Sequence, residues 1–406
     1  MSQMNRRRAL QLLAALGTTG LAAGCATEDD SEARPTGAPI RIGLIRPESG
    51  PGKQVGQDMA NGFDTYLALN GQRLGGHPVT LEVADEGDSA KTGQAAVDGL
   101  LKKGVLALTG VVDSQVLAGV REDVERARVP LVASNASPTS LQSVVYIWRT
   151  SYVLDEPGRA LADYLKVRLP ASSRIAIVAP EGAASLDVVQ GFRRQFGADD
   201  KRIVGEPIWT TAAANPNDST YRYDIRQALG RRPTAIFCNF SGKAAIEFVR
   251  QLRLRERWAG NVYAPGFLTE GTVLSELRGT LVDQRDNLKP GTIQTVLNYS
   301  ADLNNNANRV FAGAYRKKYG VQPTTYAMAS YDAAQVLDKA IGLAGPEPTP
   351  QQVNLALGKI GQIDSPRGVW QFNQPRTPQQ KWYLRRVQFD GRLLSNVTIN
   401  EIATLG

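Results

Sequence analysis

The sequence predicts an α/β protein built from two lobes. From residue 40 onward, short runs of β-branched and apolar residues alternate with stretches that have helical spacing. This alternation occurs in two series of similar length, and an additional strand and a pair of helices follow them. Strands that alternate with helices are typical of a parallel sheet with crossover helices. We therefore expect one such sheet in each lobe.

The first series covers residues 40–148. The run 40–45 (IRIGLI) has the composition of a buried strand, and 55–70 carries apolar residues at helical spacing. The expected strands are 40–45, 78–84, 105–109, 129–133 and 144–148, and the expected helices are 55–70, 92–103 and 115–128.

The second series and the tail repeat these patterns. The expected strands are 174–178, 202–209, 235–238 and 261–264, and the expected helices are 156–168, 186–196, 221–229 and 244–256. A strand at 292–297 precedes helices at 307–319, 325–344 and 351–357, and residues 345–350 (GPEPTP) interrupt the helical pattern. The tail has β spacing at 369–372, 382–389 and 393–397, with Asp390-Gly391 as a hairpin turn.

The order of these elements predicts where the chain passes between the lobes. The expected crossing points lie near Thr150, Gln294 and Gly345. The first lobe then comprises 40–150 plus 295–345, and the second comprises 151–294 plus 346–406. Since ligands in open α/β sheets bind at the carboxyl ends of the strands, we expect a binding cleft between the two lobes.

Residues 1–24 have the order of an export signal. Three arginines precede an apolar run at 9–23 that is too short to span a bilayer. The stretch 5–10 (NRRRAL) resembles a twin-arginine signal, which a dedicated translocase reads as an address. We expect this signal peptide to direct the protein out of the cytoplasm.

The segment after the signal predicts a lipid anchor. Residues 22–25 (AAGC) resemble a bacterial lipobox, in which Cys25 becomes the lipidated first residue; Ala22 departs from the leucine that lipoboxes prefer. Residues 25–39 are mostly polar, contain proline and have no apolar periodicity, as expected of a flexible tether. The mature chain is then a globule held outside the cell membrane.

Charge and composition exclude several classes of function. The net charge is +8, and it falls to +5 without residues 1–24, which hold three arginines and no acidic residue. Basic and acidic residues alternate in most segments, so we expect no nucleic-acid partner. The sequence shows no histidine pair, cysteine cluster or spaced set of carboxylates, so we expect neither a metal nor a cofactor.

The cysteine and histidine content argues against an enzyme. Cys238 is the one cysteine besides Cys25, and it lies in an apolar run that predicts a buried, inert thiol. His77 is the single histidine, and the segment 75–78 (GGHP) has the composition of a turn. Nucleophilic catalysis of the Ser-His-Asp or Cys-His kind would have to use His77, so we predict no enzymatic activity.

Several short motifs follow one another in order along residues 40–400. They are 42–44 (IGL), 49–50 (SG), Gly56, 70–71 (NG), 75–76 (GG), 85–88 (DEGD), Gly110 with Ser114, 130–132 (PLV), 134–138 (SNASP), 148–151 (WRTS), 174–178 (RIAIV), 191–192 (GF), 233–236 (PTAI) and 331–333 (YDA). Their order and spacing resemble type I periplasmic binding proteins, in particular the leucine/isoleucine/valine-binding branch. The resemblance implies two doubly wound, Rossmann-like lobes joined by three hinge crossings.

The resemblance also implies a set of ligand contacts in the first lobe. Ser114 corresponds to the serine that holds the ligand carboxylate in amino-acid-binding members, although it could also be a plain helix N-cap. Asn135, Ala136 and Ser137 correspond to a segment that offers a carbonyl, an N–H and a hydroxyl, although Ser137 before a proline could simply form a turn. Tyr326 corresponds to an aromatic pocket position, or it could be a packing residue of a helix.

The second lobe departs from the family pattern. Ala184-Ser185 stands where amino-acid binders usually have an aromatic residue that stacks on the ligand. The acidic residue for the ligand ammonium corresponds to a position near Phe267, and Glu270 is the nearest acid. Phe240 could serve as a replacement wall, next to Ser241. We therefore expect recognition of a carboxylate or polar head group more than of an amino acid.

These expectations combine into a functional hypothesis. The protein is an extracytoplasmic, lipid-anchored solute-binding protein that captures a small polar ligand, an amino acid or a related carboxylate or amide, in the cleft. It delivers this ligand to an ABC permease in the membrane. Two alternatives stay open: a ligand-sensing receptor of the same fold without transport, and, with less support, an extracytoplasmic enzyme.

Overall fold

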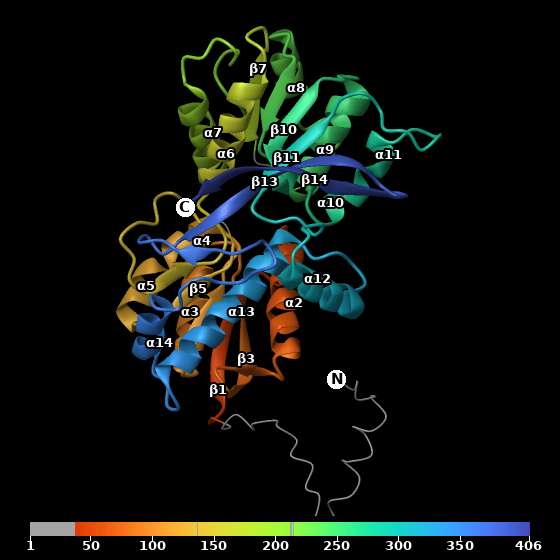
Figure 1. Ribbon diagram of the computed structural model, residues 1–406. Coiled ribbons are helices and arrows are strands. Elements are labelled where there is room, and N and C mark those ends of the chain that lie inside the picture. Colours follow the sequence, from red (N-terminus) through yellow and green to blue (C-terminus); the bar gives the residue numbers. More distant parts are fainter. Residues whose placement is uncertain (1–36, 136, 212, 214) are drawn as a thin grey trace, which may run out of the picture. The chain divides into compact units, whose positions relative to one another are not determined.

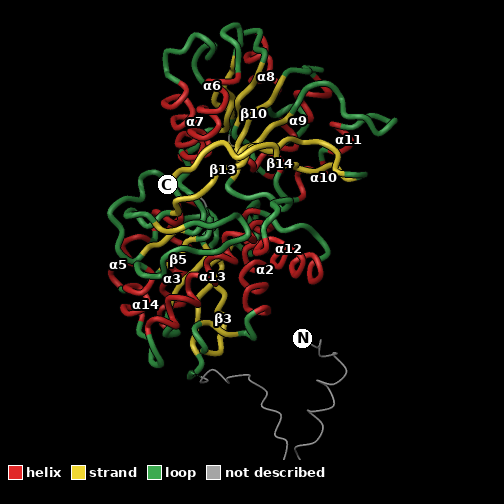
Figure 2. The backbone as a smooth tube through the Cα atoms, in the orientation of Figure 1, coloured by secondary structure: helices red, strands yellow, loops and turns green. Residues whose placement is uncertain are grey.

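A computed structural model describes residues 37–406 except 136, 212 and 214 (Figure 1). The predicted signal peptide, the predicted lipobox with Cys25 and most of the predicted tether lie outside the described residues. Within residues 37–406, two sheets with helices on their faces make up the fold (Figure 2). The chain is therefore of the α/β class that its sequence predicts.

The first sheet has the strand order β2-β3-β1-β4-β5-β6, and all its pairs are parallel except β2 with β3. Its strands are β1 (Ile40–Arg46), β2 (Arg73–Leu74), β3 (His77–Asp85), β4 (Ala107–Gly110), β5 (Leu131–Ala133) and β6 (Ile147–Arg149), and the helices between them are α2 (Lys53–Leu69), α3 (Ala90–Lys102), α4 (Ser114–Gly119) and α5 (Arg121–Ala127). Side chains of α3, α4 and α5 pack on one face of this sheet, and those of α2, α13 (Thr325–Ala344) and α14 (Pro350–Leu357) pack on the other.

The second sheet has the order β12-β13-β11-β10-β9-β7-β8, with β14 paired to β13. Its strands are β7 (Ile175–Pro180), β8 (Ile208–Thr210), β9 (Ala235–Cys238), β10 (Asn261–Pro265), β11 (Ile293–Leu297), β12 (Gln371–Phe372), β13 (Pro378–Asp390) and β14 (Leu393–Leu405). The helices of this part are α6 (Glu156–Arg168), α7 (Ala183–Phe196), α8 (Arg222–Gly230), α9 (Gly242–Arg250), α10 (Thr272–Glu276) and α11 (Arg278–Leu281), with a π-helix, η1 (Gln251–Arg255), and a 3₁₀-helix, η2 (Gly266–Thr269).

Strand β9 shows how the sequence pattern produces the core of this sheet. Ala235 and Phe237 pack into the cluster that contains α6 and α7, whereas Ile236 and Cys238 pack into the cluster that contains α8 and α9. Successive side chains of a strand point to opposite faces, so a run that is apolar throughout is buried on both sides. Burial raises the pKa of the Cys238 thiol, as expected of an inert cysteine.

The chain passes between the two sheets three times, as the fold class predicts. It leaves the first sheet after β6, returns after β11 to helices α12 (Asn306–Tyr319) and α13, and leaves again toward β13. Helix α13 packs closely against α2. The two helices approach so closely at Gly62 of α2 that a Cβ atom there would lie 1.9 Å from the carbonyl oxygen of Ala327 in α13. The returning helices are thus an integral part of the first half.

Two crossing points differ from the predicted ones. Strand β11 belongs to the second sheet throughout, so the second crossing follows Leu297 rather than Gln294. Helix α14 and Trp370 pack in the same core cluster as Ile42 and α13, although residues 346–406 were expected in the second lobe. The periodicity of a short helix reports that one face is buried, but not which sheet buries it.

Several element boundaries also differ from the expected ones. The expected helix 115–128 is divided at Val120 into α4 and α5, and the expected helix 244–256 changes into the π-helix η1 after Arg250. The expected strand 202–209 is reduced to β8, whereas the last strand runs on to Leu405 because it pairs with β13 along its whole length. The predicted hairpin is confirmed, but its two turn residues are Gly391 and Arg392, because Asp390 still pairs with Leu393.

His77 was predicted in a turn, and this prediction is wrong. The turn comprises Gly75 and Gly76, and His77 is the first residue of β3, where it is 3% exposed. Its Nδ1 lies 2.9 Å from the carbonyl oxygen of Ala38. Among the described residues, no helix is long and apolar enough to cross a membrane, and no group of three or more His, Cys, Asp or Glu could hold a metal ion.

Candidate functional site

The predicted site residues of both lobes follow the carboxyl ends of parallel strands. Ser114 comes after β4, and Asn135 and Ser137 come after β5. In the second half, Ser185 lies in α7 after β7, and Phe267 lies in η2 after β10. These are the strand ends at which open α/β sheets bind ligands. Ala136 lies outside the described residues.

The loop before Ser114 is held by the side chains of Glu86, which is buried, and Asn135, which is half-buried. The carboxylate of Glu86 accepts hydrogen bonds from the backbone N–H of Val112 at 2.7 Å and of Asp113 at 2.6 Å. The side-chain amide of Asn135 donates to the carbonyl oxygen of Val112 at 2.7 Å. Burial raises the pKa of Glu86 to about 7. Three hydrogen bonds therefore hold this loop in its conformation.

Ser114 is not the N-cap of its helix. Asp113 occupies that position, and its carboxylate accepts hydrogen bonds from the N–H groups of Gln115 and Val116. Ser114 is the first residue of α4 and is partly exposed. The simple capping role for the Ser114 hydroxyl is thus excluded, and its role as a ligand contact stays a prediction.

The segment after β5 pairs with the first connection between the sheets. Ser137 is fully buried; its N–H donates to the carbonyl oxygen of Tyr152 at 2.9 Å, and the N–H of Leu154 donates to the carbonyl oxygen of Ser137 at 2.9 Å. Next to it, Thr139 donates to the carboxylate of Asp187 in α7 through its N–H at 2.9 Å and through its hydroxyl at 2.6 Å. This segment therefore contacts both a connection and a helix of the second half.

Three aromatic rings from distant parts of the chain form what we call the aromatic stack: Tyr152, Phe267 and Tyr326. The rings of Tyr152 and Phe267 are stacked with their centroids 6.0 Å apart, and those of Phe267 and Tyr326 are nearly parallel, also at 6.0 Å. Aromatic pairs of this kind contribute about 0.5–1.5 kcal/mol beyond the apolar area that they bury. The stack brings two predicted residues, Phe267 and Tyr326, to one place.

Tyr152 carries an unused hydrogen-bonding group. Its side chain is fully buried, and its hydroxyl has no hydrogen-bond partner among the described residues. The edge of the Tyr152 ring packs against Trp382 at a centroid distance of 5.2 Å. A buried hydroxyl without a partner costs about 1–3 kcal/mol, so a ligand atom that bonds to it would bind more tightly.

Glu270 lies beside the stack, but it already has a cationic partner. One of its carboxylate oxygens lies 2.9 Å from the guanidinium of Arg385, and the other accepts a hydrogen bond from the N–H of Thr325 at 2.8 Å. The side chains of Glu270 and Arg385 are 7% and 3% exposed. The charge that the prediction reserved for a ligand ammonium is therefore compensated within the protein.

A second buried acid, Asp58, lies close to Glu270. It accepts hydrogen bonds from the Thr324 hydroxyl and the Gln54 amide, both at 2.9 Å. Burial raises its pKa, and repulsion from Glu270 acts in the same direction.

The remaining predicted residues of the second half lie in other surroundings. Phe240 is a core residue rather than a pocket wall, because its ring stacks on Phe248 at 4.2 Å and it is 2% exposed. Ser241 is exposed at the start of α9. Ser185 is buried and accepts a hydrogen bond from Asn239, and Ala184 packs against the neighbouring core cluster. We leave Phe240 and Ser241 out of the proposed site.

Sequence reasoning missed Tyr152 and Arg385. Tyr152 directly follows the motif 148–151 (WRTS), so its position next to a recognised motif was the available signal. Arg385 lies in the middle of β13, and nothing in the strand pattern indicates that it pairs with Glu270, which directly follows η2.

A hollow of about 330 Å³ lies apart from these residues, beside α9 and η1. Arg250 and Arg255, which line it, are already paired with acidic residues.

Comparisons with known proteins indicate the family and the fold of this chain. A family model described as periplasmic binding protein matches residues 39–392. The chain is similar to the Leu/Ile/Val-binding protein homolog 6 of Brucella melitensis, with 24% identity over 92% of both chains. Its fold is similar to that of a solute binding protein of an ABC transporter from R. palustris in complex with 4-hydroxybenzoate, with a TM-score of 0.79, 22% identity, and coverage of 90% of this chain and 97% of that one. It is also similar to a leucine binding protein from Thermotoga maritima, with a TM-score of 0.77, 17% identity, and coverage of 89% and 98%.

Proposed function

Because the chain belongs to the periplasmic binding protein family and is a solute-binding protein of the ABC transporter type, we propose that it captures a small carboxylate or amide between its two halves. The ligand would contact the first half through Ser114 and Asn135, and it would lie beside the aromatic stack. The protein would then deliver it to an ABC importer. The single observation that carries this proposal is the aromatic stack, which joins segments from both halves at the carboxyl ends of the strands.

The charges beside the stack favour a ligand without an ammonium group. Glu270 is paired with Arg385, and the Asp58 carboxylate already accepts hydrogen bonds from Thr324 and Gln54. A buried ammonium without a carboxylate partner is strongly unfavourable. Among the small carboxylates, this argument favours aromatic acids over branched-chain amino acids.

The rings and the unpaired hydroxyl of Tyr152 support the same choice. A flat ring can stack on Phe267 or Tyr326, and a polar substituent of that ring can bond to the Tyr152 hydroxyl. The similar R. palustris protein is in complex with 4-hydroxybenzoate. We therefore propose 4-hydroxybenzoate and related aromatic acids as the first ligands to test.

We expect 4-hydroxybenzoate to bind at least tenfold more tightly than leucine or isoleucine, a difference of about 1.4 kcal/mol. Isothermal titration calorimetry on the purified protein measures each dissociation constant. A ligand present at about 100 times its Kd also adds roughly 2.7 kcal/mol of stability, which a thermal shift detects. Tighter binding of leucine or isoleucine would contradict the assignment.

The variant Glu270→Gln separates the two ligand classes. If the ligand is an aromatic acid, the variant keeps or increases affinity, because it leaves the cation of Arg385 available beside a carboxylate. If the ligand is an α-amino acid, the variant loses binding. Glu276→Gln, on the exposed surface of α10, is the matched control. Binding should be measured at a temperature at which both variants are folded.

We also propose that Cys25 anchors the mature protein to the membrane from outside the cytoplasm, after removal of residues 1–24. Cys25→Ser should then release the protein from the membrane fraction, and its mass should show that no lipid is attached. Cys238→Ala should leave the anchor in place. A Cys25→Ser protein that stays in the membrane fraction with the same mass increment as its parent would refute the anchor.

If the protein takes part in transport rather than in sensing, we expect genes for a permease and an ATPase next to its own gene.

A further inference from the structure

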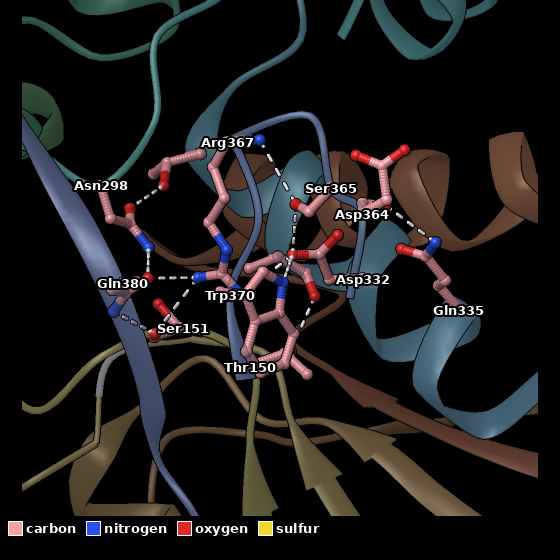
Figure 3. Close-up of polar contacts among 12 residues, drawn as sticks. Thr150, Ser151, Asn298, Asp332, Gln335, Asp364, Ser365, Arg367, Trp370 and Gln380 are labelled. Atoms are coloured by element: carbon pink, nitrogen blue, oxygen red, sulfur yellow. Dashed lines mark hydrogen bonds and ion pairs between the residues drawn. The ribbon is translucent and has the colours of Figure 1, made fainter. Parts of the chain in front are cut away.

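The three connections between the sheets meet at one set of buried polar side chains, shown in Figure 3. We call Ser151, Asn298, Arg367 and Gln380 the crossing junction. Ser151 follows β6 on the first connection, Asn298 follows β11 on the second, and Gln380 lies near the start of β13 on the third. All four are at most 3% exposed.

Gln380 bonds to both other connections. Its amide nitrogen donates to the carbonyl oxygen of Ser151 at 2.9 Å, and its amide oxygen accepts a hydrogen bond from Asn298 at 2.9 Å. Arg367 donates to the same amide oxygen. Because the oxygen faces two donors and the nitrogen faces an acceptor, the amide fits in one orientation only. The Gln380 side chain therefore bonds to both other connections, and Arg367 adds a longer hydrogen bond to the carbonyl oxygen of Ser151 at 3.5 Å.

The guanidinium of Arg367 is fixed in turn by the core of the first half. It lies 2.9 Å from the carboxylate of Asp332 in α13, and it stacks over the ring of Trp370 at 4.4 Å. Asp332 also accepts hydrogen bonds from Ser365 at 2.8 Å and from Trp370 at 3.0 Å (Figure 3). The junction thus has a rigid support on one side, whereas the second sheet enters it through β13.

The junction is directly connected to the aromatic stack. Ser151, whose carbonyl oxygen bonds to Gln380, is followed by Tyr152. Trp382, two residues after Gln380 on β13, packs against the Tyr152 ring. Arg385, on the same strand, pairs with Glu270. A displacement of β13 relative to the first connection would therefore change the positions of Tyr152, Trp382 and Arg385 relative to one another.

We infer that Gln380 is a positioning residue, which couples the three connections and holds Tyr152 in the aromatic stack. The role of Tyr152 in ligand binding rests on the proposed function, whereas the coupling of the three connections does not depend on any ligand. The inference predicts that loss of the hydrogen bond between Gln380 and Ser151 increases local opening, and thus hydrogen exchange, in the first connection.

The test compares Gln380→Glu with Gln379→Leu in the full chain without ligand. The glutamate keeps the acceptor for Asn298 and Arg367 but, when ionised, loses the donor to Ser151; Gln379 is the exposed neighbour on the same strand and serves as the matched control. Hydrogen exchange should accelerate by roughly tenfold in peptides that contain the protected N–H groups of Ser137, Thr150 and Leu154. Peptides from β1 and β3 should be unchanged. This factor corresponds to about 1.4 kcal/mol, within the range for one buried hydrogen bond.

Two results would overturn the inference. One is exchange in Gln380→Glu that equals that of the parent and of Gln379→Leu; the other is an acceleration that is equal in all peptides, which a general loss of stability would produce.

The pH dependence of the Gln380→Glu variant gives a further check. Position 380 faces one cation, Arg367, and one titratable acid, the buried Glu156. At low pH the carboxyl group introduced at this position is protonated and regains a donor, so exchange in the variant should return to the rate of the parent protein measured at the same pH. If Gln380→Glu does not fold, Gln380→Met, which adds no charge, is measured in the same way at a single pH.

A second measurement separates this inference from the proposed function. The dissociation constant of 4-hydroxybenzoate should rise by roughly three- to tenfold in Gln380→Glu and stay unchanged in Gln379→Leu. If 4-hydroxybenzoate fails to bind the parent protein, the ligand proposal is wrong, and the exchange experiment alone decides the coupling. If it binds the parent and Gln380→Glu equally well, Gln380 does not position Tyr152.

Discussion

Replacing Asp332 with asparagine is expected to lower the free energy of unfolding by about 3–5 kcal/mol. The Asp332 and Arg367 side chains are 0% and 1% exposed and lie 2.9 Å apart. Burial raises the pKa of Asp332 to about 6, because loss of hydration outweighs the attraction of Arg367. At pH 8 the carboxylate is ionised, and its removal would leave a buried guanidinium without a counter-charge.

Urea unfolding at pH 8 measures this change. The control is Asp286→Asn, which breaks the pair of Asp286 with Arg278, whose side chains are 79% and 43% exposed. Exposed pairs contribute about 0–1 kcal/mol, so the control should change little. The double variant Asp332→Leu with Arg367→Met should regain part of the loss, since it removes both charges together. A loss below about 1 kcal/mol in Asp332→Asn would show that water reaches this pair.

The stability of the protein should fall as the pH rises from about 4.5 to about 8, and Glu156→Gln should remove much of this fall. Glu156 is 3% exposed, and burial raises its pKa from 4.5 to about 8, with Asp155 adding repulsion. The folded state therefore binds the proton more tightly than the unfolded state does. The stability linked to Glu156 is present below pH 4.5 and is lost as the pH passes through about 8.

Urea unfolding at intervals from pH 5 to pH 9 tests this sign. The difference between the parent and Glu156→Gln should change by roughly 3–5 kcal/mol over that range. Glu82→Gln is a control with the opposite sign, because a hydrogen bond from Lys103 lowers the pKa of Glu82. It should therefore leave the fall with pH in place. A parent protein whose stability rises over this range would contradict the assignment.

Much of the fold followed from local patterns. The apolar runs at β1, β7 and β9 have the lengths of buried strands, and the alternation of strands with helices predicts parallel sheets. Motif order also singled out Phe267 and Tyr326, whose rings the structure stacks on each other, while their contact with a ligand stays a prediction. The local patterns did not predict the packing of an element that could lie against either sheet. Helix α14 has a buried face, but its spacing does not indicate that this face lies against α13.

The sequence by itself determined the class of the fold, the order of its elements and the strand ends at which a ligand would bind. The reason is that periodicity and turn residues act over a few neighbouring positions. Tertiary structure alone decided the pairing of Glu270 with Arg385, the place of Tyr152 in the aromatic stack, and the meeting of Ser151, Asn298 and Gln380. These residues lie far apart in the chain, and the partner of a buried charge or amide depends on which segments the packed core brings within hydrogen-bond distance. The pairing of Glu270 with Arg385 is the reason that the proposed ligand carries no ammonium group, although the sequence alone offered this acid as an ammonium partner.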